Sequence, residues 1–357
     1  MCTIGELTTK VGSGVTPRGG EAVYKTEGHP FVRSQNVGLG NLLLDDIAFI
    51  DEETHLRQKS TELQFNDVLL NITGASIGRS ALVDKQIVGG NVNQHVCIIR
   101  TKENLVPSFI CSFLLSNYGQ RQIDSFQAGG NRQGLNFEQI KSIKITIPSK
   151  DEQIKIAKLL RAIDERIATQ NKIIEKLQSL IKGIAQNVAR NNKPNIRLSE
   201  CLECSSSTLQ ESDVCKNGTY PVYGANGIVG YLDNYNTEKE AVYIIKDGSG
   251  VGTVSYVTGK CSATGTLNTL QAKEGYSLQY LYYMLKVFNF EPYKTGMAIP
   301  HIYFKDYGKA KIFCPSYTEQ LKYARLLSAI DNKLSAEQSI LTDLSLQKQY
   351  LLRQMFI

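Results

Sequence analysis

The sequence has no hydrophobic run long enough to cross a bilayer, which takes about 20 consecutive apolar residues. Its first residues carry neither a cluster of positive charge nor an apolar stretch, so we expect no secretory signal. The eight cysteines lack the regular spacing of a disulfide framework. We therefore expect reduced thiols and a cytoplasmic protein without a membrane partner.

The sequence also has little excess charge of either sign. Lys and Arg number 40 against 34 Asp and Glu, and the formal net charge is +6. This small excess permits a nucleic-acid partner without demonstrating one. With 42% hydrophobic and 21% charged residues, the chain is not disordered as a whole, and its 357 residues suit two domains with connectors.

Motifs of the common catalytic classes are absent. The sequence has no nucleotide-binding loop that ends in Gly-Lys-Ser or Gly-Lys-Thr, and no serine elbow of the Gly-x-Ser-x-Gly type. It also lacks the Pro-Pro motif of amino-methyltransferases and any helicase or nuclease motif. The glycine-rich residues 248–252 lack the third glycine of a dinucleotide fingerprint, so we interpret them as a tight turn. These absences favour a binding and assembly component over an enzyme.

The metal-ligating residue types do not form a recognisable site either. Cys201 and Cys204 have the spacing of one zinc half-site, but the sequence offers no obvious second half-site. The four histidines are not spaced as ligands. We expect no metal in this chain and expect the cysteines to be core thiols.

An internal repeat is the strongest signal in the sequence. Residues 145–164 and 312–331 align at an offset of 167, with identical Pro-Ser, Glu-Gln and Ala-x-Leu-Leu-x-Ala-Ile-Asp residues. Further upstream, the glycine-rich residues 74–78 match residues 248–252 at an offset of 174. The likeness at the start of each copy has an offset of 194, so the second copy lacks 27 residues of the first. The chain therefore consists of two similar copies, and each copy comprises a globular module followed by a long helix.

Each helical part begins with a start signal and continues with a heptad pattern. After Pro148, Ser149 is in the N-cap position and Glu152 stands where a capping box places its carboxylate. Apolar residues then recur at alternating spacings of four and three, which is typical of a coiled-coil seam. The seam residues are Leu160, Ile163, Ile167, Ile174, Leu177 and Ile181 in the first copy, and Leu327, Ile330, Leu334, Leu341, Leu344 and Leu351 in the second.

The seams predict that the two helices pair within one chain. A helix over residues 156–188 is about 50 Å long and, being apolar along one stripe, needs a partner helix. Gln170 is a polar member of the first seam, and Glu337 and Lys348 interrupt the second. A buried helix of an ordinary helical core is the simpler alternative, but the same periodicity in two copies favours a coiled coil. Residues 191–195 end the first helix and form a hinge.

The parts before the helices have mixed character, and we assign them to the α+β class. Strands are expected over residues 68–72, 96–99, 144–147, 241–245 and 251–257, and helices over residues 107–118 and 277–288. We divide the chain into module 1 (residues 1–148), the first long helix and linker (149–195), module 2 (196–315) and the second long helix (316–357).

Over essentially its whole length, the chain resembles the DNA specificity subunit of a type I restriction-modification system. Both helix starts, at residues 148–153 and 315–320, have the pattern Pro-x-x-x-Glu-Gln of this family. Residues 220–232 resemble a frequent opening of its target recognition domains. The resemblance implies two similar target recognition domains, separated by two long antiparallel coiled-coil helices, in an internal pseudo-twofold repeat.

The resemblance also implies a function and partners. Each target recognition domain would read one half of a bipartite site in double-stranded DNA, at a spacing set by the coiled coil. Methylation subunits, usually two, would supply S-adenosylmethionine and methylate adenine N6 on a flipped base. Restriction subunits would add ATP-driven translocation and cleavage, with Mg²⁺. This chain would direct methylation and restriction while having no catalytic residue and no cofactor of its own.

Polar and aromatic loop residues at matching positions of the two modules are the candidates for DNA contact. Arg and Lys suit guanine edges and phosphates, whereas Asn and Gln suit adenine edges. The candidates are Arg33, Gln35, Asn36, Asn131, Arg132 and Gln133 in module 1, and Asn226, Lys294, His301 and Tyr303 in module 2. Loop residues of these types are often only solvated, so each is a weak prediction taken alone.

Two functions of other classes stay open. One is a coiled-coil scaffold that assembles protein partners without DNA specificity. The other is a nuclease that uses scattered carboxylates such as Asp45, Asp46 and Asp67, although solvated turns are the simpler interpretation of these acids.

Overall fold

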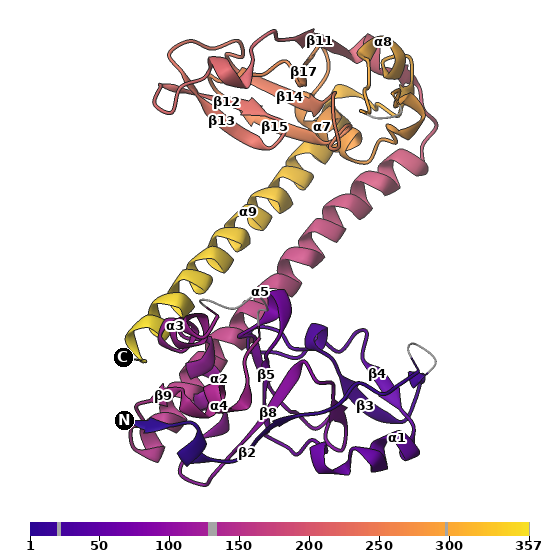
Figure 1. Ribbon diagram of the computed structural model, residues 1–357. Helices are drawn as coiled ribbons and strands as arrows, with labels where there is room; N and C mark the ends of the chain where they lie inside the picture. The colour runs from indigo at the N-terminus through magenta and orange to yellow at the C-terminus, as the bar shows by residue number, and fades with distance from the viewer. Residues whose placement is uncertain (20–22, 128–133, 297–298, 357) are drawn as a thin grey trace. The chain divides into compact units, whose positions relative to one another are not determined.

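The computed structural model describes residues 1–19, 23–127, 134–296 and 299–356 (Figure 1). Contacts divide the chain into two compact units. Unit 1 comprises Met1–Gln170 and Ile340–Ile357, and unit 2 comprises Asn171–Ser339. Each unit therefore contains one globular module together with one end of each long helix.

The described residues of unit 1 form three small sheets. One is a four-stranded antiparallel sheet with the strand order β2-β8-β5-β6, and another pairs β1 with β9. In the third, with the order β4-β3-β7, β3 and β7 run parallel. The strands are β1 (Cys2–Thr3), β2 (Thr8–Ser13), β3 (His29–Val32), β4 (Ala48–Ile50), β5 (Val68–Asn71), β6 (Ser80–Leu82), β7 (Asn91–Val92), β8 (Val96–Thr101) and β9 (Lys144–Ile145).

The helices of module 1 are short. They are α1 (Glu52–Arg57), α2 (Pro107–Leu115), α3 (Asn117–Ser125) and α4 (Phe137–Ser142). α2 packs on β5 and β6, where Phe109 and Ile110 join Val68 and Leu70 in the main core of the unit. The burial of these apolar side chains is the main force that holds the short elements together.

Unit 2 repeats the sheet topology of unit 1. Its sheets have the orders β11-β17-β14-β15 and β13-β12-β16, with β12 and β16 parallel, and β10 pairs with β18. The strands are β10 (Ile196–Arg197), β11 (Leu202–Ser206), β12 (Tyr220–Gly224), β13 (Gly227–Leu232), β14 (Glu240–Ile245), β15 (Val254–Thr258), β16 (Ser262–Ala263), β17 (Leu267–Ala272) and β18 (Lys311–Ile312). The helices are α6 (Leu198–Cys201), α7 (Leu278–Lys286) and α8 (Phe304–Tyr307). The predicted α+β repeat is confirmed.

Several predicted elements are shorter than expected, among them the strand over residues 144–147, which ends at Ile145, and the helix over residues 277–288, which spans Leu278–Lys286. The strand expected over residues 251–257 begins at Val254, because the preceding glycines form a turn in which Gly248 and Gly252 have φ angles of 98° and 91°. The helix expected over residues 107–118 ends at Leu115. It ends there because the backbone of Ser116 is extended, with a ψ of 160°. The hydroxyl oxygen of Ser116 then caps the start of α3 by accepting the backbone N–H of Gly119.

The long helices are α5 (Lys150–Arg190) and α9 (Tyr317–Gln354) (Figure 1). Within unit 1, Asp164 near the start of α5 pairs with Lys348 near the end of α9. Within unit 2, Ile181 near the end of α5 lines a cavity together with Leu334 from the first half of α9. The helices are therefore antiparallel within each unit. No helix of the described chain is both long and apolar enough to span a membrane.

The predicted seam residues lie on the inner faces of these helices. Buried members are Leu160, Ile163, Ile174, Ile181, Leu327, Leu334 and Leu344, and half-buried members are Ile167, Leu177, Ile330, Leu341 and Leu351. The polar members Gln170 and Glu337 are buried as well. Lys348 does not end the second helix, since α9 continues to Gln354. The ammonium group of Lys348 forms an ion pair with the carboxylate of Asp164, which compensates its charge within the seam.

The repeated Pro-Ser-x-x-Glu-Gln segment has a defined structural task at each helix start. The hydroxyl of Ser149 donates to the carboxylate of Glu152 over 2.7 Å, and the backbone N–H of Ser149 donates to the same oxygen over 3.0 Å. Ser316 and Glu319 make the equivalent hydroxyl–carboxylate bond over 2.9 Å. The predicted capping box is present at Ser149, where it satisfies N–H groups that the helix leaves unpaired.

The glutamine that follows joins each long helix to its module. The side-chain carbonyl of Gln153 accepts the backbone N–H of Val106 over 2.9 Å at the start of α2. In unit 2, Gln320 accepts the N–H of Ser277 at the start of α7, also over 2.9 Å. Both glutamines are almost fully buried, with exposed fractions of 1% and 2%. Each fixes the position of a long helix relative to the neighbouring short helix.

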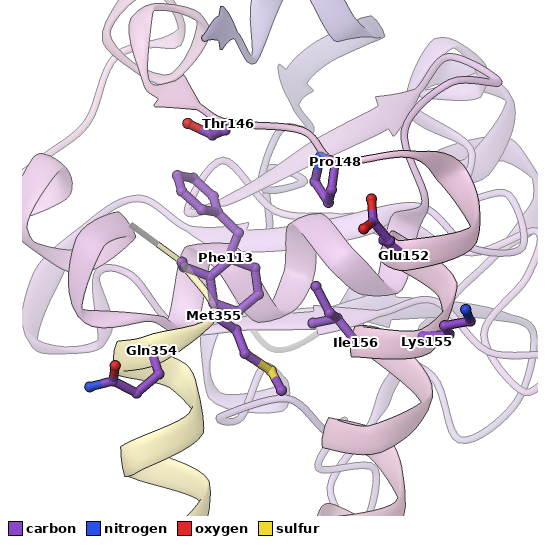
Figure 2. Close-up of a pocket in the computed structure, with 9 residues that line it drawn as sticks. Phe113, Thr146, Pro148, Glu152, Lys155, Ile156, Gln354 and Met355 are labelled. Carbon is purple, nitrogen blue, oxygen red and sulfur yellow. The ribbon is translucent and has the colours of Figure 1, made fainter.

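The residues that follow α9 pack into module 1. The ring of Phe356 lies 5.2 Å from Phe109 and 6.0 Å from Phe113, measured between centroids. Beside these rings lies a mostly apolar cavity of about 540 Å³, with Glu152 and Lys155 of α5 among its lining residues (Figure 2). This aromatic contact ties the C-terminal end of α9 to the core of unit 1.

We expect Gln320→Ala to weaken the junction between α9 and α7. The change leaves the buried N–H of Ser277 without its acceptor, which costs about 1–3 kcal/mol. Urea denaturation should show a less stable chain, and amide hydrogen exchange at Ser277 should be faster. The exposed Gln347→Ala on the same helix is the matched control and should change neither. Unaltered exchange at Ser277 would show that the glutamine does not hold this junction.

Candidate nucleic-acid interface

Three candidate residues of module 1 converge on the carboxylate of Asp46. They lie in and before a 3-10 helix, Ser34–Asn36, that directly follows β3. The guanidinium of Arg33 donates to the backbone carbonyl of Asp46 over 2.7 Å and lies 3.5 Å from its carboxylate. The side-chain amides of Gln35 and Asn36 donate to the two carboxylate oxygens. Asp46 thus orients the whole segment.

These three residues differ in what they can reach. Asn36 has no exposed surface, and its amide also donates to the carbonyl of Leu43 over 2.9 Å, so it shapes the loop from within. Arg33 is partly exposed, and its guanidinium lies over the ring of Tyr24 at 5.5 Å. Gln35 is exposed. Of the three, Gln35 is the most accessible to a ligand.

Asn131, Arg132 and Gln133 lie outside the residues that the structure describes. The chain immediately after them is anchored. Gly134 forms an antiparallel bridge with Thr73, and the N–H of Leu135 donates to the carbonyl of Ile72 over 2.8 Å. The next residue after Thr73 opens a glycine turn in which Gly74 has a φ of 72°. The three candidates therefore directly precede an anchored edge of module 1.

The equivalent edge of module 2 contains His301. This residue bridges to Asp247 just as Gly134 bridges to Thr73, and Gly248 follows Asp247 as Gly74 follows Thr73. The Nδ1 atom of His301 lies 2.7 Å from the carboxylate of Asp247. Backbone bonds from Ile302 to Lys246 and from Gly248 to Pro300, of 2.9 and 3.0 Å, hold the two segments together.

The other candidates of module 2 are accessible. Asn226 is exposed in the turn between β12 and β13, followed by Gly227 with a φ of 100°. The ammonium of Lys294 pairs with Glu291 over 2.6 Å. Tyr303 is 48% exposed, and the ammonium of Lys305 lies 5.3 Å from its ring centroid. These residues occupy several loops, and within the described part of the chain they do not share one hydrogen-bond network.

Sequence reasoning missed the acids that organise these segments. The sequence suggests Asp46 only as a possible nuclease carboxylate and gives no signal for Asp247. Sequence reasoning also missed Lys260, which lies over the rings of Tyr220 and Tyr235. A hydrogen bond with Tyr235 raises the pKa of Lys260 above its usual value. Each of these contacts joins residues from separate segments of the chain, so a local sequence pattern cannot predict it.

Two of the three carboxylates of the nuclease alternative, Asp46 and Asp67, belong to separate hydrogen-bond networks, and Asp45 is exposed. Asp67 is 1% exposed and accepts two hydrogen bonds of 2.7 Å from Arg100, and this pairing raises the pKa of the guanidinium. Asp46 binds the segment around Asn36. Within the described ranges, no group of three or more His, Cys, Asp or Glu side chains could hold a metal ion.

The cysteines that resembled a zinc half-site lie in apolar surroundings. Cys201 is buried and Cys204 is half-buried. Burial raises the pKa of Cys201 to about 12 and that of Cys204 to about 11. Burial therefore favours the protonated form of both thiols in the metal-free chain.

Comparisons with known proteins agree with this duplicated architecture. A family model described as the type I restriction modification DNA specificity domain matches residues 1–179 and 194–345. The chain belongs to this family. It carries two specificity domains, and each match covers one module and most of the long helix that follows it.

The individual relatives have low sequence identity to this chain, and two of them align over most of its length. A protein of Mycoplasma genitalium named as a type I specificity subunit is 25% identical over 320 residues, which cover 82% of this chain and 81% of that protein. The type I restriction enzyme EcoKI specificity subunit of Escherichia coli is 23% identical over 200 residues, 53% of this chain and 41% of that one. The crystal structure of the type I S subunit from M. genitalium has a TM-score of 0.69 at 19% identity, over 99% of this chain and 95% of that chain. The last match shows the same fold.

We expect Asp46→Ala to loosen the segment that carries Arg33 and Gln35. The side-chain amides of Gln35 and Asn36 lose their shared acceptor, at a local cost of about 1–2 kcal/mol, and the backbone bond from Leu43 to Asn36 loses its lateral support. Arg33 keeps its bond to the backbone carbonyl of residue 46. Amide hydrogen exchange over residues 33–43 should become faster. The neighbouring exposed Asp45→Ala is the control, and equal exchange in both variants would contradict the role of Asp46.

Proposed function

We propose that this chain is the DNA-recognition subunit of a type I restriction-modification complex and reads a bipartite target in double-stranded DNA. The observation that carries the proposal is the duplicated module with one topology and two different exposed edges. Gln35 and Asn226 occupy the same place in the repeat, shortly after β3 and within the turn after β12, and both are exposed. Each module reads one part of the target.

The chemistry of the exposed residues suits the edges of bases and the phosphate backbone. Amide side chains such as those of Gln35 and Asn226 can donate and accept in the major groove, while Arg33 and Lys294 can contact phosphates or guanine. Asn131, Arg132, Gln133, His301 and Tyr303 complete the proposed set. Asn36 contributes indirectly, by shaping the loop that presents Gln35.

The two long helices set the distance between the two parts of the target. α5 has 41 residues and α9 has 38, so each is about 57–62 Å long. This length exceeds the pitch of B-DNA, which is about 34–36 Å. Because the helices pair along a seam, they are stiffer than a flexible linker, and the bases between the two parts are spanned without being read.

Catalysis belongs to partner subunits. Two methylation subunits dock on the helices and modules, bring S-adenosylmethionine and methylate adenine N6 on a flipped base. Restriction subunits add ATP- and Mg²⁺-dependent cleavage. This chain acts in the cytoplasm, where it supplies sequence selection and a docking frame and binds none of these cofactors itself.

Substitutions in the two modules should affect different parts of the target. In a complex reconstituted with its methylation partner, Gln35→Ala should relax base preference in one part of the site by about 1–3 kcal/mol and leave the other part unchanged. Asn226→Ala should do the reverse. Methylation rates on DNA with single-base changes measure both effects. Lys309→Ala, an exposed change in module 2, is the control. Both substitutions relaxing the same part would contradict one module per part.

Lengthening both helices should lengthen the spacer between the two parts. One heptad is inserted after Gln170 in α5 and one after Glu337 in α9, which align in the repeat. This adds about 10 Å and nearly preserves the direction of the seam. Methylation of DNA with different spacers should then favour a longer spacer. Seven Gly and Ser residues inserted after Glu274, in an exposed turn, should leave the spacer unchanged. Unchanged spacing after the double heptad insertion would exclude the role of the helices.

A further inference from the structure

Each module places one imidazole at the same point of its fold. In unit 1 the Nδ1 atom of His95 lies 2.6 Å from the hydroxyl of Thr73. In unit 2 the Nδ1 atom of His301 lies 2.7 Å from the carboxylate of Asp247. Thr73 and Asp247 are equivalent residues, since both directly precede the glycine turn and both form the bridge to the loop before α4 or α8.

The two histidines come from different segments of the repeat. His95 lies between β7 and β8, whereas His301 lies shortly before α8. The residue of unit 1 that is equivalent to His301 is Gly134. Both modules therefore place an imidazole at the same edge, but the two histidines occupy different positions of the repeat. The shared placement is not simply a residue inherited by both copies from the duplication.

The hydrogen-bond partners fix which nitrogen carries the proton. An ionised carboxylate only accepts, so Asp247 takes the N–H of Nδ1, and Nε2 of a neutral His301 ring is an acceptor. In unit 1 the carbonyl of Gln94 accepts the N–H of Thr16, so its amide N–H₂ faces Nε2 of His95 at 3.1 Å. His95 also has an acceptor at Nε2, and Gln94 already occupies it.

Unlike the ring of His95, the ring of His301 has an Nε2 atom that can accept a hydrogen bond from a ligand. Its side chain is 35% exposed, and within the described part of the chain no hydrogen bond involves its Nε2. Lys246 pairs with Asp247 over 3.8 Å, and the exposed Tyr303 lies two residues further on. Backbone hydrogen bonds to residues 246–248 fix the loop, and the contact with Asp247 fixes the ring. The ring is therefore already ordered before a ligand binds, so binding loses little conformational entropy there.

We propose that His301 reads one base of the target through Nε2, which accepts from the exocyclic amino group of adenine or cytosine in the major groove. Only these two bases present an amino donor there. Asp247 is a positioning residue that keeps the ring in the accepting tautomer. This inference rests on the proposed function and assigns a chemical preference to one position in the part of the target read by module 2.

The first test uses the full chain reconstituted with its methylation partner at about pH 8, where histidine side chains are mostly neutral. Methylation rates are measured on DNA with every single-base change. His301→Ala should lose about fivefold preference for A or C at one position and keep the others. Asp247→Ala should instead broaden that position to G or T, because the freed ring can carry its proton on Nε2. Lys309→Ala should match the parent.

The second test changes the DNA and leaves the protein intact. The base at that position is replaced by its analogue without the amino group, purine for adenine or 2-pyrimidinone for cytosine. The parent complex should lose about fivefold in rate, and His301→Ala should lose nothing further on the analogue, since the two changes remove the same contact.

The outcomes separate the inference from the proposed function. Unchanged preference at every position in His301→Ala, a uniform fall at all positions, or independent losses from ring and amino group would each overturn the role of His301. If the parent complex itself shows no sequence preference, the proposed function fails first.

Discussion

The junction between each module and its long helix depends on one buried glutamine side chain. Gln153 and Gln320 each accept the N–H that begins a short helix of the module, and each also donates to the proline carbonyl just before the long helix. With the capping carboxylate of the same motif, this bond fixes the direction in which the long helix leaves its module. The spacing proposed for the two recognition surfaces requires such a fixed departure.

The two copies of the repeat share their sheet topology but differ in the residues at their exposed loop edges. Sheet order, the parallel pair in the smaller sheet and the bridge to the loop before α4 or α8 recur in both units. At equivalent positions, however, Thr73 stands against Asp247 and Gly134 against His301. Buried positions keep packing and hydrogen bonds, while exposed loops can change chemistry at little cost in stability. Two modules of one fold can therefore present different surfaces to DNA.

The sequence predicted the parts of the structure that depend on local patterns. The heptad seam, the capping box at Ser149 and the strand composition of residues 241–245 each depend on nearby residues, and the repeat doubled the evidence for them. The candidate site was predicted less well. Asn36 is a predicted DNA-contact residue but is buried, because its side-chain amide donates to Asp46 and Leu43, which lie later in the chain. The pairing of Asp247 with His301 joins residues 54 positions apart and follows only from the tertiary fold.

The central claim is that this chain directs a methylation complex to one bipartite sequence. Genome-wide mapping of N6-methyladenine, in a host that expresses the methylation partner with and without this chain, tests it most directly. We expect a chain-dependent motif with two specified parts separated by a constant number of unspecified bases. Methylation that does not depend on the chain, or a single continuous motif, would contradict it.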